Sequence, residues 1–270
     1  MRHASLQFAI LGPLDVRRGG QAIVVNAAKQ RVILAALLLS ANRVVMADDL
    51  MERLWHNRFP RDARASLQTH LARLRRVLGD GHGACQSIHT SPGGYFIEVA
   101  ADDLDLLRYR DLLDQASRAE TVGDLAGEAR LLREALGLWR GPALADIASD
   151  SLVRDEVPQL TEEWFRALHR RFDVELTLGN HAEIVATLRR LVVRHPLRER
   201  LCGQLMIALF RCGQQVEALK VYDSLSAVLR QEYGLDVGDE LYGLHQAVLT
   251  RDPALATERG WHRSLARRAL

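Results

Sequence analysis

The sequence has few cysteines and no long apolar run. Its three cysteines, Cys85, Cys202 and Cys212, are odd in number and far apart, which argues against a disulfide framework and a zinc site and suits a reducing cytoplasm. The longest candidate for a membrane span, residues 32–39, is far too short to cross a bilayer. The N-terminus lacks an apolar region followed by a small-residue cleavage site. We therefore expect a cytoplasmic protein without a signal peptide and without a membrane partner.

Recognisable enzyme motifs are missing as well. The sequence contains no G-x-x-x-x-G-K-[ST], no G-x-G-x-x-G after a strand, no H-E-x-x-H and no G-x-S-x-G. Cys202 and Cys212 are expected to be small core residues rather than metal ligands. Four histidines of the C-terminal half have no catalytic spacing and are expected at the surface or an interface. They are His169, His181, His195 and His245. The tryptophans are too scattered to form a stacking platform, and core positions are expected for Trp55, Trp139 and Trp164. The sequence therefore predicts a protein that is not an enzyme and needs no cofactor or metal.

Charge divides the 270 residues into parts. Residues 1–100 hold 13 basic and 7 acidic side chains, a net charge of +6, whereas residues 101–250 carry −7 and residues 251–270 carry +3. The composition is that of a globular protein, and the length suits one large or two ordinary domains. We expect an N-terminal DNA-binding domain over 1–100, a helical domain over 101–250 and a basic tail over 251–270. The alternative is chance variation on a solvated surface.

The first hundred residues predict a small sheet, helices and a β-hairpin. Residues 6–16 are typical of strand, turn and strand, and residues 22–25 of a further short strand. Helical spacing follows over residues 28–40, 46–55 and 63–78. Residues 88–99 predict a hairpin with a turn at Ser91-Pro92-Gly93-Gly94. This order is the layout of a winged helix-turn-helix with an N-terminal sheet, in which the third helix reads DNA and the hairpin is the wing.

The third of these helices has an apolar side and a basic side. Its apolar stripe consists of Leu67, Leu71, Leu74 and Leu78. Its opposite side carries Ser66, Thr69, His70, Arg73 and Arg76, flanked by Arg64 and Arg75. No acid interrupts the helix, which Asp62 is placed to cap and Gly79 to end. Cations and short hydrogen-bonding groups are the side chains that bind phosphates and base edges in a major groove.

From residue 102 onward the predicted strands disappear and the spacing is helical. The expected helices cover residues 104–119, 125–139, 152–178, 182–195, 198–212, 215–233 and 238–250. The segment Gly179-Asn180-His181-Ala182-Glu183 recurs 34 residues later as Gly213-Gln214-Gln215-Val216-Glu217, and an earlier copy is expected from Gly127. A period of 34 is typical of tetratricopeptide repeats, whose helix hairpins stack to bury their apolar faces. The alternative is an irregular helical bundle.

Several segments, in the right order, carry a family resemblance. In the front half they are Leu11-Gly12-Pro13-Leu14-Asp15-Val16, Ala28-Lys29-Gln30-Arg31, Ala63-Arg64-Ala65-Ser66-Leu67-Gln68, Arg73-Leu74-Arg75-Arg76-Val77-Leu78 and Pro92-Gly93-Gly94-Tyr95. In the back half the segment is Leu138-Trp139-Arg140-Gly141-Pro142-Ala143-Leu144. From residue 6 to about residue 250 the chain resembles the AfsR/SARP family, the Streptomyces antibiotic regulatory proteins.

The resemblance implies a mainly α fold with a small β part. It implies an OmpR-type winged helix, similar to two-component output domains, followed by a tetratricopeptide-like bacterial transcriptional activation domain. It further implies a pathway-specific activator of a secondary-metabolite (antibiotic) gene cluster, associated with the nucleoid. Because larger relatives append an ATPase or a phosphothreonine-binding module, a chain of 270 residues is expected to be the minimal form.

Such proteins bind double-stranded promoter DNA at direct repeats near the −35 region. The resemblance implies neighbouring copies side by side, a homodimer on DNA, and contact with the sigma or alpha subunits of RNA polymerase. Head-to-tail binding to a direct repeat does not require a dimer in solution. The chain departs from the family pattern in the wing, where Phe96 and Ser91 stand at positions that often hold Arg.

Roles follow for the basic side of the third helix. Arg73 is expected to read a base edge, with guanine as its partner, and Thr69 and His70 to contact bases or adjacent phosphates. Ser66 lies near the helix start, where a phosphate is favoured. Phosphate clamps are expected from Arg75 and Arg76. For Arg64, counted among the DNA-binding residues, and for Arg75, the alternatives are surface solubility and an ion pair within the protein.

Further candidates lie outside this helix. Lys29 and Arg31 begin the first helix and could approach the DNA backbone or simply lie at the surface. In the wing, contacts to the minor groove or to phosphates are expected from Thr90, Ser91 and Gly93.

The loop over residues 56–61 is the segment that OmpR-type relatives direct toward RNA polymerase. The candidate contacts there are Trp55, Arg58 and Phe59. The alternative is that Trp55 and Phe59 close the core beneath the third helix.

Two other function classes remain open. The chain could be a peptide- or protein-binding scaffold that uses its helical repeats, with the winged helix as an accessory. An enzyme would need a cleft with perturbed carboxylates. The tail over 251–270 could dock on the helical domain or contact DNA.

Overall fold

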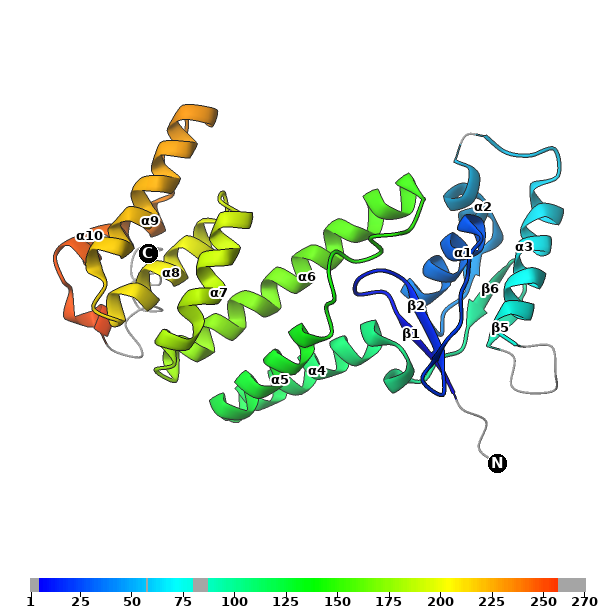
Figure 1. The fold of residues 1–270 in the computed structure, drawn as a ribbon, viewed down its shortest axis with the longest axis horizontal. Helices are drawn as coiled ribbons and strands as arrows, with labels where there is room; N and C mark the ends of the chain where they lie inside the picture. The colour runs from blue at the N-terminus through cyan, green and yellow to red at the C-terminus, as the bar shows by residue number, and fades with distance from the viewer. Residues whose placement is uncertain (1–4, 57, 80–86, 257–270) are drawn as a thin grey trace. The chain divides into compact units, whose positions relative to one another are not determined.

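The computed structural model describes residues 5–56, 58–79 and 87–256 and is mainly helical with a small β part (Figure 1). Its contacts divide the chain into two compact units. The first contains residues 1–118 and 131–166, and the second contains residues 119–130 and 167–270.

The first unit begins with an antiparallel sheet in the order β1-β2-β3. Strands β1 (Leu6–Ala9) and β2 (Asp15–Arg18) pair with Leu6 opposite Arg18, and β3 is the short segment Gln21–Ala22. The further strand expected over 22–25 thus covers only residues 21–22. The chain leaves the sheet after the Ile23 N–H donates to the Val16 carbonyl at 2.8 Å, because Val25 then turns into the core.

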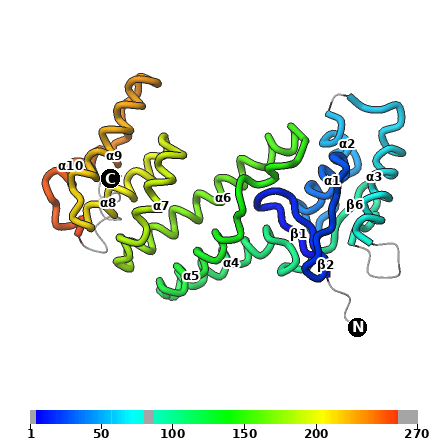
Figure 2. Tube along the Cα trace, viewed as in Figure 1, coloured from blue at the N-terminus to red at the C-terminus, as the bar shows by residue number. Residues whose placement is uncertain are grey.

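Helices α1 (Ala28–Leu39), α2 (Ala47–Trp55) and α3 (Ala63–Val77) pack against one another (Figure 2). Helix α1 is apolar on most sides, and its residues 33–38 are fully buried. The Asp62 carboxylate accepts a hydrogen bond from the Ala65 N–H at 2.9 Å and caps α3, which ends before Gly79 at a φ of 75°. Both predicted signals at the ends of α3 are confirmed.

The predicted hairpin is confirmed as β5 (Ile88–Ser91) and β6 (Gly94–Ile97). A strand that was not predicted, β4 (Val45–Met46), completes this sheet in the order β4-β6-β5. At Gly94 a Cβ atom would lie 2.2 Å from the Val45 carbonyl oxygen, so only glycine lets the two strands approach here. The pairing ties the wing to the residues directly before α2.

Helical elements complete the first unit. Helices α4 (Asp105–Thr121), α5 (Leu125–Gly137) and α6 (Asp150–Thr177) follow the short helix η1 (Ala101–Asp103). The Asp105 carboxylate accepts hydrogen bonds from the Ile10 and Leu11 N–H groups at 2.8 and 2.9 Å. Arg53 of α2 pairs with Glu156 of α6 at 2.8 Å. The winged helix and the first part of the helical region therefore share one compact unit.

An aromatic cluster forms part of this unit. The ring centroids of Tyr109 and Trp139 are 5.6 Å apart, those of Trp139 and Trp164 are 6.3 Å apart, and those of Trp164 and Phe165 are 4.9 Å apart. These contacts are edge-on or tilted and form no stacking platform. Trp139 and Trp164 pack against Tyr109 and Phe165 because α4 and α6 bring distant segments of sequence together.

The second unit contains helix pairs joined by short turns. Its helices are α7 (His181–Arg194), α8 (Glu199–Arg211), α9 (Gln215–Val228) with the π-helical turn η2 (Leu229–Tyr233), α10 (Asp239–Leu249) and η3 (Pro253–Ala256). Helix α8 packs against α7 and α9 and is buried along residues 201–209. No helix in the described part of the chain is long and apolar enough to cross a membrane.

Three turns in this unit share one geometry. Gly123, Gly179 and Gly213 have φ values of 76°, 81° and 76°. In each case the N–H of the next residue donates to a carbonyl five residues earlier, at 2.9 Å. The predicted spacing of 34 between Gly179 and Gly213 is confirmed as a structural repeat. The earlier copy begins at Gly123 and not at Gly127, which lies inside α5.

Two predictions for the second unit had different outcomes. Cys202 is fully buried, as expected, and burial raises the pKa of its thiol to about 11. His169 was expected at the surface or an interface but is buried within the second unit. Its Nδ1 lies 2.9 Å from the Gln204 side-chain oxygen, and the Gln204 amide donates to Asp173 at 2.6 Å. This network between α6 and α8 satisfies polar groups that sequence spacing does not reveal.

Candidate nucleic-acid interface

The two sides of α3 differ as the sequence predicts. Leu67, Leu71 and Leu74 are at most 1% exposed. On the other side, the exposed members are Arg64, Gln68, Thr69, Arg73 and Arg76. Ser66, His70 and Arg75 are half-buried. The apolar stripe anchors α3 in the first unit, so its basic side is held in place and open to a ligand.

The centre of the basic side is strongly cationic. Arg73 forms no ion pair or hydrogen bond with any described residue, so its guanidinium is available. The pKa of His70 is lowered, first by burial and then by the charges of Lys29 and Arg73. Lys29 of α1 also lies over the Trp55 ring, with its amino group 4.8 Å from the ring centroid. Helices α1 and α3 thus contribute cations to the same surface, which favours an anionic ligand.

Arg75 connects α3 to the wing. Its Nε donates to the Ile88 carbonyl at 3.0 Å, and its Nη2 donates to the Thr90 hydroxyl at 3.0 Å. Arg75 therefore has an intramolecular role, as the alternative proposed, but through hydrogen bonds and not through an ion pair. Arg64 differs, since it lies 3.9 Å from Asp48 and both side chains are at least 70% exposed.

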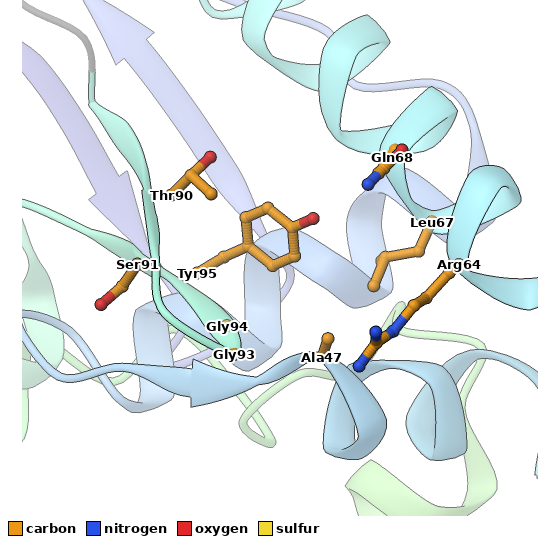
Figure 3. Close-up of a pocket in the computed structure, with 9 residues that line it drawn as sticks. All are labelled: Ala47, Arg64, Leu67, Gln68, Thr90, Ser91, Gly93, Gly94 and Tyr95. Carbon is orange, nitrogen blue, oxygen red and sulfur yellow. The ribbon is translucent and has the colours of Figure 1, made fainter.

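A hollow of about 170 Å³ lies between the start of α3 and the wing (Figure 3). Its lining comprises Ala47, Arg64, Leu67, Gln68, Thr90, Ser91, Gly93, Gly94 and Tyr95. Arg64 and Gln68 supply a guanidinium and an amide to this hollow, whereas the Ser91 hydroxyl points away from it (Figure 3). Such donors can bind a phosphate oxygen. The structure thus brings Arg64 together with Thr90, Ser91 and Gly93, all four predicted from sequence.

Sequence reasoning missed Gln68. Gln68 follows Arg64 by four residues and therefore lies on the same exposed side of the helix. This spacing could have identified Gln68 as a candidate. An uncharged amide was passed over in favour of the cations, although Gln side chains pair well with adenine edges.

The remaining candidates lie at the edges of this surface. Arg31 pairs with Asp146 and donates to the Val25 carbonyl, so its charge is already compensated. Phe59 is 50% exposed and Arg58 is exposed. The alternative that Phe59 closes the core is therefore wrong, whereas Trp55 is half-buried against Lys29. The loop before α3 presents an aromatic and a basic side chain to solvent.

The described residues contain no cluster of three or more His, Cys, Asp or Glu side chains that could hold a metal ion. The surface of α3 and the wing offers hydrogen-bond donors and positive charge. Its arrangement suits binding of a polyanion.

Comparisons with known families cover both halves of the chain. Residues 20–97 match the family described as transcriptional regulatory protein, C terminal, and residues 104–249 match the bacterial transcriptional activator domain. A winged helix followed by this helical domain defines a bacterial transcriptional regulator. The chain belongs to the AfsR/SARP family of transcriptional activators.

Individual relatives agree with this assignment. The chain is 40% identical to the regulatory protein AfsR of Streptomyces coelicolor over 93% of its own length but spans only 25% of that relative. It is 34% identical to the regulatory protein DnrI of Streptomyces peucetius, of which it covers 94%. A solved structure of Mycobacterium tuberculosis EmbR in complex with a low affinity phosphopeptide is similar with a TM-score of 0.87 and 29% identity, covering 97% of this chain and 70% of EmbR.

Proposed function

We propose that the chain is a sequence-specific activator that binds double-stranded promoter DNA through α3 and the wing. The observation that carries the proposal is the basic side of α3, where Arg73 is free of described partners and Lys29 adds a second charge. Membership of a transcriptional activator family supports it. In this proposal residues 1–100 bind DNA and residues 101–250 form the activation region, part of which shares a compact unit with the winged helix.

The side chains divide into readers and backbone contacts. Arg73 reads a base edge in the major groove, and Thr69, Gln68 and His70 contact neighbouring bases or phosphates. The hollow between α3 and the wing receives a backbone phosphate. The groups that hold this phosphate are Arg64 and the Gly93 backbone. Ser66, near the start of α3, and Ser91 of the wing contact phosphates outside the hollow. Arg76 clamps a further phosphate, and Lys29 supplies long-range attraction.

The promoter site is a direct repeat near the −35 region, occupied by neighbouring copies. Trp55, Arg58 and Phe59 present a surface for RNA polymerase, because the loop they flank is exposed beside the reading helix. The regulated genes are those of a secondary-metabolite cluster. Membership of the Streptomyces antibiotic regulatory protein family, with relatives named as regulators from Streptomyces, supports this last part. The protein acts in the cytoplasm, at the nucleoid.

The test uses a duplex enriched from a random library by the wild-type chain. Arg73→Ala is expected to bind this duplex about tenfold to a hundredfold more weakly, which corresponds to the loss of one bidentate base contact. Its affinity for a shuffled duplex should change much less. Arg154→Ala, an exposed arginine of α6, is the matched control and should bind both duplexes as the wild type does.

Two outcomes contradict the proposal. If Arg73→Ala keeps both affinity and sequence preference, α3 is not the reader. If the wild-type chain enriches no duplex, the scaffold function gains support over DNA binding. Circular dichroism of each variant shows that the fold is kept.

A further inference from the structure

Helix α7 presents an exposed face that is basic at its sides and apolar at its centre. The face consists of Ala186, Arg189, Arg190, Val193 and Arg194, which are spaced three and four residues apart and are all exposed. Val193 is 80% exposed, and Leu197 in the following turn is 45% exposed. Exposed aliphatic side chains enclosed by polar ones are typical of interaction surfaces.

The positive charge of this face is not compensated within the described residues. Residues 184–198 contain four arginines and no Asp or Glu. Arg189 and Arg190 make only long hydrogen bonds of 3.4 Å to the neutral side chains of Gln214 and Thr187. Arg194 forms no ion pair or hydrogen bond with a described residue. Glu217, the acid of α9 whose charge Arg189 influences, is already paired with Lys220 at 2.9 Å.

The electrostatic effect of this cluster is visible at His195, the residue that follows α7. Its pKa is lowered by burial and then by the charges of Arg198 and Arg194. The positive potential at the end of α7 therefore disfavours another cation. An anionic partner would relieve this repulsion.

We propose that the α7 face is a docking surface for an acidic amphipathic helix of a protein partner. Two kinds of contact, ion pairs and apolar packing, identify the chemistry of this partner. Carboxylates of such a helix pair with Arg189, Arg190 and Arg194, and its aliphatic side chains cover Val193 and Leu197. A DNA backbone would satisfy the arginines but would leave Val193 exposed. The surface is separate from the DNA-reading face of α3 and goes beyond the proposed function.

The test measures binding of a labelled synthetic peptide to the full chain by fluorescence anisotropy. The peptide has about 20 residues, long enough to be helical, with leucine on one face and glutamate elsewhere. Arg190→Gln combined with Arg194→Gln is expected to weaken binding about tenfold, and Val193→Ser several-fold. Arg154→Gln is the matched control and should have no effect. A second peptide with serine in place of every leucine should bind more weakly than the first.

The same variants are tested with the enriched duplex and with a shuffled duplex, and by sedimentation. Unchanged DNA binding and an unchanged sedimentation coefficient support a separate protein-docking surface. The proposal is overturned if the arginine variant binds the peptide normally, or if the serine peptide binds as well as the leucine peptide. It is also overturned if the arginine variant loses binding to the shuffled duplex, because the face would then be a DNA contact. Loss of self-association by the same variant would overturn it as well, because the occupant would then be a second copy of the chain. Failure of the α3 proposal would appear instead in the Arg73→Ala experiment.

Discussion

The guanidinium of Arg75 donates a hydrogen bond to the hydroxyl of Thr90 at 3.0 Å and so joins α3 to the wing. A second bond, to the Ile88 carbonyl, fixes the plane of the same guanidinium. The rigid fork of an arginine can make both bonds at once, whereas a lysine ammonium is a flexible point charge. The angle between α3 and the wing therefore depends on a residue that the sequence suggested as a phosphate clamp.

Arg75→Lys should hold the wing less firmly against α3 while keeping the positive charge of α3. We expect operator affinity to fall about fivefold, as for the loss of about 1 kcal/mol of hydrogen bonding. A hydroxyl-radical footprint should lose protection on the wing side and keep it where α3 binds. Arg76→Lys is the matched control, since Arg76 is exposed and one position away. A uniform loss of protection in Arg75→Lys would contradict a positioning role.

Binding of the enriched duplex should depend strongly on salt. The slope of log affinity against log salt concentration is about −0.9 for each phosphate neutralised. Arg76→Gln is expected to reduce the magnitude of this slope by about 1, because one phosphate contact is lost. The control variant Arg154→Gln should leave the slope unchanged. If the affinity of the wild-type chain does not change with salt concentration, this result would argue against DNA binding.

Operator affinity should increase as the pH falls toward the pKa of His70 in the free protein, which lies below the ordinary histidine value. In the free protein the pKa of His70 is lowered by burial and by Lys29 and Arg73, so the ring is neutral at pH 7. A nearby DNA phosphate favours the protonated ring, so protons are taken up on binding. Affinity is thus gained as the pH drops through the pKa that His70 has in the complex. Titration of His70→Gln should show a weaker pH dependence, and an identical profile would exclude His70.

Asp105→Ala should destabilise the fold. The carboxylate accepts hydrogen bonds from the Ile10 and Leu11 N–H groups, and both of these residues are fully buried. Two unpaired buried donors reduce the free energy of unfolding by about 2–4 kcal/mol. Urea denaturation measures the change. Asp111→Ala, an exposed position on the same helix, should change it by less than about 0.5 kcal/mol. An equal effect of both substitutions would show that the Asp105 contact is not stabilising.

Much of the candidate site could be predicted because its signals are local. The leucine spacing of α3, the cap at Asp62 and the glycine after the helix each depend on a few neighbouring residues. The same holds for the β-hairpin and for the repeated turn at Gly179 and Gly213. The earlier repeat was misplaced by four residues, since a glycine alone does not distinguish a helix end from a helix interior.

Contacts between distant segments could not be predicted in this way. The sequence by itself determined where the helices and the wing hairpin lie, and which side of α3 is apolar and which is basic, whereas strand β4 came only from its pairing with β6. Only the tertiary structure decided that Arg75 faces the wing while Arg73 stays free, and that Trp139 meets Trp164. It also decided that the winged helix shares a compact unit with α4 and α6. The physical reason is that periodicity fixes the direction of a side chain around its own helix, whereas its partner depends on how helices far apart in the chain pack together.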